Sequence, residues 1–102
     1  GITSDARSPA QPEVRTVIEQ GIKDFEITAW FGFMAPAGTP KPIVNQLSKD
    51  VAAVLAIPEV NKRISEMATE VVGSTPEAYA EFIKSETAKW KKVIISAKMT
   101  PD

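Results

Sequence analysis

The clearest alternation of apolar and polar residues lies between Phe25 and Met34, which reads FEITAWFGFM. Apolar residues occupy every second position, a period that is typical of a strand with one buried face. The segment is also rich in the aromatic and β-branched residues that strands favour. We therefore predict a strand over residues 26–34, and Trp30 on its second face indicates that this face is partly covered as well.

Three later segments repeat apolar residues at the spacing of a helix. The predicted helices cover residues 40–56, 58–68 and 75–98. A proline stands at or beside each start, where its missing N–H leaves no hydrogen bond unmade. The last helix has the longest apolar stripe, and we predict that its members are packing residues: Tyr79, Phe82, Ile83, Trp90, Val93, Ile94 and Ala97.

The remaining segments predict loops, one short turn of helix and one short strand. Thr16 and Glu19 have the spacing of a capping box, and Gly21 suits the position after a helix end. Residues 69–73 are a second strand candidate. The predicted fold class is therefore α/β, with three main helices on a small sheet of two or three strands. Such a sheet is too small to be complete, so we expect partner strands outside this chain and an edge at residues 25–34 that invites association.

Length, composition and charge limit the classes of function. The 102 residues suffice for one domain, and a net charge of −1 gives no basic footprint for nucleic acid. Cysteine and histidine are both absent, which excludes cysteine-based zinc sites, disulfides, thiol nucleophiles and imidazole catalysis. No apolar run approaches the roughly 20 residues of a membrane helix. No signal peptide is visible in residues 1–5.

Residues 30–40, WFGFMAPAGTP, resemble the W-x-G-x-x-A-P-A-G-T-P signature of the Bug-type receptors of tripartite tricarboxylate transporters. Other family motifs lie on both sides of it in the family's order: Thr3-Ser4 with Arg7-Ser8-Pro9 and Pro12, Thr16 to Gly21, Phe25-Glu26, Pro58-Glu59-Val60, Gly73 to Glu77, Glu86, Trp90 and Lys98 to Asp102. The chain departs from the pattern at Arg15, where proline is common, and over residues 20–24, where a second glycine is frequent. Both departures fall in a loop.

The resemblance implies a periplasmic receptor whose ligand cleft lies between two α/β lobes. Family members are much longer than this chain, and the matches correspond to their C-terminal end. Residues 1–102 are therefore interpreted as a single-domain, helix-rich C-terminal fragment of a two-lobed periplasmic-binding-protein fold. Within it, residues 1–34 would hold the lobe-crossing segment and strand, and residues 35–102 the C-terminal helices.

The function that the resemblance implies is the capture of small carboxylates for a secondary transporter. Its partners would be the carboxylate ligand and the membrane transporter subunits, with no nucleic acid, cofactor, metal, enzyme activity or direct insertion into the membrane. The alternative is a stand-alone small α/β interaction or regulatory domain without ligand binding. Sequence upstream of Gly1 with a signal peptide and further βα units would favour the receptor.

The candidate ligand-binding residues are Trp30, Gly32, Phe33, Gly38 and Thr39. The loop Ala35–Pro40 joins a glycine to a helix start, where N–H groups attract anions such as carboxylates. Capping alone also accounts for every residue of this loop. Trp30 and Phe33 would line the edge of the cleft, but aromatic residues on a strand are more often part of the core.

Two further groups of charged residues have simple structural explanations. Carboxylate pairs at helical spacing, such as Glu77 with Glu81, are typical of a solvated helix face. Lys89, Lys91 and Lys92 gather near a predicted helix C-terminus, where the helix dipole favours positive charge without any partner.

Overall fold

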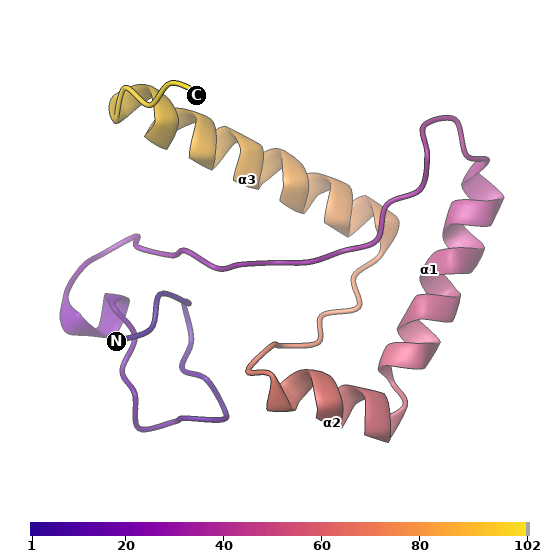
Figure 1. The fold of residues 1–102 in the computed structure, drawn as a ribbon, viewed down its shortest axis with the longest axis horizontal. Helices are drawn as coiled ribbons and strands as arrows, with labels where there is room; N and C mark the ends of the chain where they lie inside the picture. The colour runs from indigo at the N-terminus through magenta and orange to yellow at the C-terminus, as the bar shows by residue number, and fades with distance from the viewer. Residues whose placement is uncertain (102) are drawn as a thin grey trace. The chain divides into compact units, whose positions relative to one another are not determined.

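The computed structural model describes residues 1–101 and is mainly helical. A short 3-10 helix, η1 (Ile18–Gln20), precedes three α-helices, which are α1 (Lys41–Leu55), α2 (Pro58–Glu66) and α3 (Pro76–Ser96) (Figure 1). The three predicted helices are therefore confirmed, with boundaries that differ by one or two residues. The chain groups into two compact units. The first contains Gly1–Gly38 and Leu55–Val71, and the second contains Thr39–Val54 and the residues from Val72 onward.

Prolines and short polar side chains set the helix starts. In α3, Pro76 occupies the first turn and the Oγ1 of Thr75 accepts a hydrogen bond of 3.2 Å from the N–H of Ala78. In α2, Pro58 is the first helical residue and no side chain caps the helix. In α1, the carbonyl of Pro40 accepts the first bonds, so the helix begins one residue later than predicted.

The cap of α3 gives a first testable prediction. Thr75→Ala removes the acceptor for the N–H of Ala78 and should lower the free energy of unfolding by about 1 kcal/mol. Thr75→Ser keeps the hydroxyl and should stay close to the parent. Urea denaturation followed by circular dichroism measures both variants. Equal stability of the alanine and serine variants would show that Thr75 does not cap α3.

The C-terminus of α3 is closed by a left-handed residue. Lys98 has φ of 53°, its N–H donates to the carbonyl of Ile95 at 3.2 Å, and the N–H of Met99 donates to the carbonyl of Ile94 at 3.0 Å. This pair of bonds is the Schellman arrangement, in which glycine is usual because a side chain at positive φ is unfavourable. Pro101 follows and cannot extend the helix.

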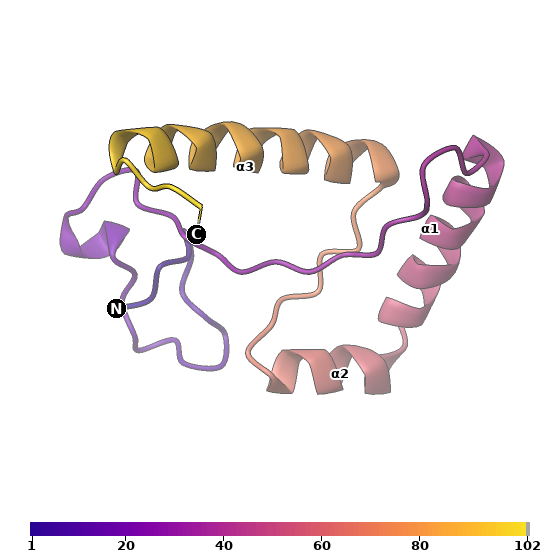
Figure 2. The same cartoon turned by 45° about the horizontal axis from the view of Figure 1, so that its top comes forward.

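The predicted sheet of two or three strands is wrong. Within residues 1–101 neither residues 25–34 nor residues 69–73 form a strand, and the β-pairing there is one isolated parallel bridge between Ile2 and Thr16. Residues 26–36 instead run as a drawn-out, uncoiled segment (Figure 2). Two hydrogen bonds join this segment to Thr3. The N–H of Ile27 donates to the carbonyl of Thr3 at 2.9 Å, and the Thr3 hydroxyl donates to the carbonyl of Ile27 at 2.6 Å. Alternation gives a segment strand propensity, but a strand also needs a neighbour for its ladder.

The apolar residues of the chain do not form a buried core. Among residues 1–101 the one buried side chain is Thr16, at 1% exposure. Phe31 and Phe33 of the uncoiled segment are 87% and 82% exposed. On α3, Trp90 is half-buried and Phe82 is 39% exposed, so the predicted packing residues are only partly covered. The apolar patterns of the sequence thus find no buried packing partners within residues 1–101.

Candidate functional site

The loop Ala35–Pro40 leads the chain into α1. Gly38 has φ of 82°, a left-handed conformation that favours glycine, and is exposed. Thr39 is half-buried, and the carbonyl of Pro40 takes the capping position. The loop thus turns at Gly38 and leads into the first turn of α1, where the N–H groups of Ile43 and Val44 donate to the carbonyl of Pro40.

Trp30, Gly32 and Phe33, the other candidate ligand-binding residues, lie along the uncoiled segment and are exposed to solvent. The exposed fractions are 37% for Trp30 and 82% for Phe33. An exposed row of side chains on one segment offers a ligand a single surface, whereas small-molecule sites bury most of the ligand in a concave pocket. The three residues therefore do not make a site by themselves.

A hollow of about 350 Å³ lies in the second unit, at the first turns of α1 and α3. Its lining residues are Thr39, Lys41, Val44, Asn45, Pro76, Glu77 and Ala80. Thr39 is the one candidate residue among them. Sequence reasoning missed Lys41, Asn45 and Glu77, because nothing local signals that two helix starts separated by more than thirty residues come together.

The charges of this hollow partly cancel. The first turns of both helices favour an anion, and Lys41 adds a positive charge. The Nζ of Lys41, however, lies 3.7 Å from the Oε1 of Glu77, and the two side chains are 77% and 65% exposed. Such an exposed ion pair contributes little, and its carboxylate competes with any incoming anion. The hollow is therefore a weak candidate for a carboxylate site.

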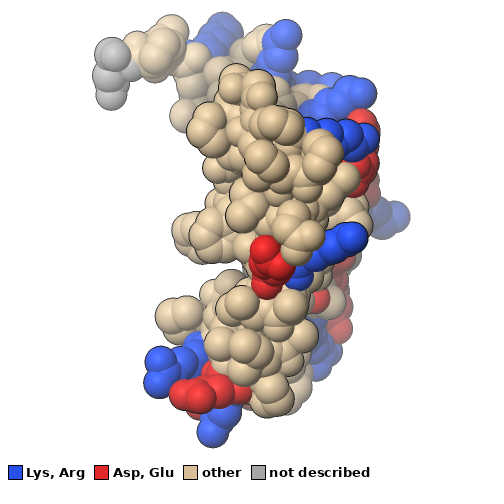
Figure 3. Space-filling model, turned by 90° about the vertical axis from the view of Figure 1, so that its right-hand side faces the viewer, with Lys and Arg blue, Asp and Glu red and all other residues tan. Residues whose placement is uncertain are grey.

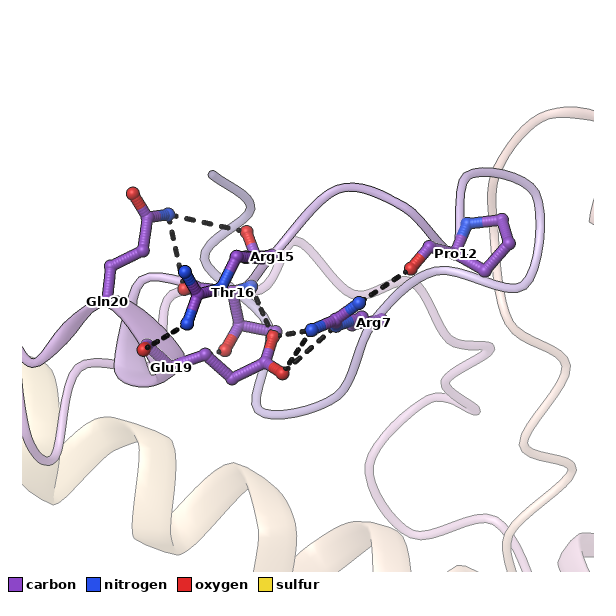
Figure 4. Close-up of polar contacts among 6 residues, drawn as sticks. All are labelled: Arg7, Pro12, Arg15, Thr16, Glu19 and Gln20. Carbon is purple, nitrogen blue, oxygen red and sulfur yellow. Dashed lines mark hydrogen bonds and ion pairs between the residues drawn. The ribbon is translucent and has the colours of Figure 1, made fainter.

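The strongest polar cluster joins Arg7 to Glu19 (Figure 4). The guanidinium donates to both carboxylate oxygens, with its Nε at 3.0 and 2.9 Å and its Nη2 at 2.7 Å, while its Nη1 donates to the carbonyl of Pro12. The N–H of Thr16 donates to Glu19 at 2.8 Å, and the N–H of Glu19 donates to the Thr16 hydroxyl at 3.1 Å. The predicted capping box is therefore confirmed, with Gly21 closing η1 at φ of 103°.

This cluster fixes the loop between Arg7 and Thr16. The guanidinium of Arg7 and the carboxylate of Glu19 neutralise each other. The hydrogen bonds from Arg7, followed by the one from the Thr16 N–H, lower the pKa of Glu19 from 4.5 to about 2. Both partners are engaged with each other, so the cluster serves structure and leaves no charge for a ligand.

The lowered pKa gives a second prediction. A carboxylate with a depressed pKa stabilises the loop above the ordinary value of 4.5, and that stabilisation is lost as the pH falls towards about 2. A carbon-detected NMR titration of the Glu19 carboxyl should therefore have its midpoint near 2. Arg7→Ala should move this midpoint back towards 4.5, although the Thr16 N–H retains part of the shift. An unchanged midpoint in that variant would remove Arg7 as the main cause.

Other classes of site find no support in the described structure. No three His, Cys, Asp or Glu side chains within residues 1–101 are placed to hold a metal ion. In the same range, no helix combines the length and the apolar character needed to cross a membrane. On the face drawn in Figure 3, acidic and basic side chains both appear, so a field of one sign does not cover it.

Comparison with known proteins decides the family. The family model described as Tripartite tricarboxylate transporter family receptor (TctC) matches residues 1–99. The chain belongs to this receptor family. The match covers both compact units and includes all five candidate ligand-binding residues.

Individual proteins are similar to this chain over most of its length. The chain is 36% identical over 100 residues to the UPF0065 protein in the tcbD-tcbE intergenic region of Pseudomonas sp. (strain P51), covering 97% of this chain and 30% of that protein. It is 38% identical over 99 residues to the UPF0065 protein in the TAR-I ttuE-ttuC' intergenic region of Agrobacterium vitis, covering 94% and 29%. Protein BugT of Bordetella pertussis is 31% identical over 93 residues, covering 91% and 28%. The chain thus spans about 30% of the length of these relatives.

Proposed function

We propose that this chain is the C-terminal part of a periplasmic solute-binding receptor that captures small carboxylates for a tripartite tricarboxylate-type transporter. The observation that carries the proposal is the family match over residues 1–99, together with relatives about three times as long as the chain. In this proposal the ligand and the membrane transporter subunits are the partners, and the chain catalyses no reaction.

The exposure of the apolar residues supports the interpretation as a part of a larger receptor. An autonomous domain buries apolar side chains to offset the entropy of folding, and residues 1–101 bury none completely. In the proposed receptor, residues 1–34 include the segment that crosses between two lobes, and residues 35–102 supply the C-terminal helices of one lobe. The alternative, a stand-alone interaction or regulatory domain, has no such support.

The candidate residues Trp30, Gly32, Phe33, Gly38 and Thr39 are then proposed to contribute to the ligand site of the full-length receptor. Trp30 and Phe33 are exposed, and Thr39 borders the hollow at the start of α1. The other residues that surround the ligand would come from the remainder of the receptor. This arrangement follows the general geometry of a ligand site, which needs concave surroundings on most sides.

The experiment that tests the proposal is calorimetric titration of the full-length receptor against C4–C6 dicarboxylates, citrate and aromatic acids. We expect micromolar binding of at least one of these acids, which also names the ligand class. A purified and folded receptor that binds none of them would contradict the carboxylate function.

A further inference from the structure

Arg7 and Glu19 together fix the backbone at Thr16. The guanidinium of Arg7 donates to both oxygens of the Glu19 carboxylate and to the carbonyl of Pro12. The same carboxylate accepts the N–H of Thr16 at 2.8 Å (Figure 4). Thr16 is 1% exposed, and cover by the rest of a receptor would only add to this burial. The conformation of the chain at Thr16 therefore depends on the Arg7–Glu19 pair.

The backbone on both sides of Thr16 in turn holds Ile2. The N–H of Ile2 donates to the carbonyl of Arg15 at 3.1 Å, and the carbonyl of Ile2 accepts from the N–H of Val17 at 2.8 Å. These two bonds form the parallel bridge between Ile2 and Thr16. Because both bonds come from the neighbours of Thr16, the position of Ile2 depends on the same backbone that the cluster fixes.

Thr3, the next residue, extends this connection to the segment that contains Trp30. The N–H of Ile27 donates to the carbonyl of Thr3, and the hydroxyl of Thr3 donates to the carbonyl of Ile27. Ile27 precedes Trp30 by three residues, and both lie in the same compact unit as Arg7 and Glu19. All of these contacts join residues of this chain, so none of them depends on which side chains the rest of the receptor covers.

We propose that Arg7 is a positioning residue for the ligand site, because the hydrogen bonds that begin at its guanidinium fix the backbone at Ile27 and thereby the place of Trp30. Arg7 does not hold the ligand itself, since its guanidinium is engaged by Glu19. A segment that is already held in its bound position loses less freedom on binding. The inference rests on the proposed function, in which Trp30 contributes to the carboxylate site.

The test is calorimetric titration of full-length receptor variants with the panel of C4–C6 dicarboxylates, citrate and aromatic acids. Arg7→Ala should weaken binding of the acid that the parent binds by roughly 3- to 30-fold, the range found for substitutions in a connecting network. Thr3→Val, which loses the hydroxyl bond to Ile27, should also weaken it. The double variant R7A/T3V should lose less than the product of the two single effects, because both substitutions break the same connection. Fully independent effects would overturn the inference.

Glu19→Gln separates positioning from direct contact with the ligand. This variant weakens the hold on the guanidinium but leaves the charge of Arg7 in place. Positioning predicts weaker binding of the acid, whereas an arginine that contacts the carboxylate directly would bind it as well or better. Equal or tighter binding in Glu19→Gln would therefore overturn the inference. A loss of stability in Arg7→Ala with the parent's ligand affinity would also overturn it and assign the cluster to structure alone.

The matched control is Arg63→Ala, which breaks an arginine–glutamate pair with Glu59 on α2 in the same compact unit. It should change ligand affinity by no more than about twofold, as expected for an exposed ion pair. A loss equal to that of Arg7→Ala would show that the effect is not specific to the connection through Thr3.

Hydrogen exchange of the Ile27 amide tests the same connection without a ligand. In Arg7→Ala this amide should exchange at least about tenfold faster than in the parent receptor, because the loss of charged hydrogen bonds favours local opening. Arg63→Ala should leave the rate within about twofold. An unchanged rate in Arg7→Ala would overturn the inference whether or not an acid of the panel binds. Absence of binding by the parent receptor contradicts the proposed function instead.

Discussion

Phe31→Ala in the full-length receptor is expected to lower the free energy of unfolding by about 3–5 kcal/mol, the usual cost of removing a buried phenylalanine. In the chain described here Phe31 is 87% exposed, and Phe33 and Met34 beside it are 82% and 70% exposed. Soluble proteins rarely leave a contiguous apolar surface of this kind uncovered. Residues 27–40 also contain no charged side chain that would keep the segment in water. We therefore expect the rest of the receptor to cover it.

Urea denaturation of the full-length receptor measures this effect. Lys49→Ala, a substitution at an exposed position of α1, is the control and should change stability by no more than about 0.5 kcal/mol. Phe33→Ala should resemble Phe31→Ala, because both side chains belong to the same exposed apolar segment. A loss below about 1 kcal/mol for Phe31→Ala would mean that residues 27–34 remain exposed in the receptor.

The helices could be predicted from the sequence because their signals are local. Thr75, Pro76 and Glu77 set the start of α3 through contacts within one turn, and the structure shows the predicted cap. The capping box of Thr16 and Glu19 was predictable for the same reason, since three residues of spacing fix both hydrogen bonds. Arg7, which completes that cluster from twelve residues away, carried no comparable signal.

The sheet could not be predicted in the same way. The alternation in residues 25–34 indicates which face of a strand would be apolar. It does not indicate which other segment would pair with that strand. The structure provides hydrogen bonds at Ile27 and Thr3 and no ladder beyond them within residues 1–101. Pairing between strands depends on residues distant in sequence, so a correct local pattern led to an incorrect fold class.

The candidate site was predictable only as far as its loop. Gly38 and Thr39 do form a turn into a helix, as their composition indicated. The hollow beside them depends on Glu77 lying near Lys41. No sequence motif predicts a contact between residues so far apart along the chain. The exposure of Trp30 and Phe33 is likewise a property of tertiary structure. In the proposed receptor, the identity of the bound acid depends on residues outside this chain.

The second large effect concerns ligand affinity. The full-length receptor should bind a small carboxylate with a micromolar dissociation constant, which corresponds to about 8 kcal/mol. The 102-residue chain alone should bind the same acid with a dissociation constant weaker than about 1 mM. One helix start contributes only about 0.3–1 kcal/mol to holding an anion at an exposed site. The exposed Lys41–Glu77 pair adds little to that, because the carboxylate of Glu77 offsets the lysine.

Side-by-side calorimetric titration of the full-length receptor and the 102-residue chain is the most direct measurement of whether this chain is one part of a carboxylate receptor. We predict saturable micromolar binding of one acid of the panel to the receptor, and no measurable heat with the chain under the same conditions. Circular dichroism recorded beside the titration measures how much helix the isolated chain retains. Micromolar binding by the chain alone would contradict the account, because it would make the surface around Thr39 a complete site.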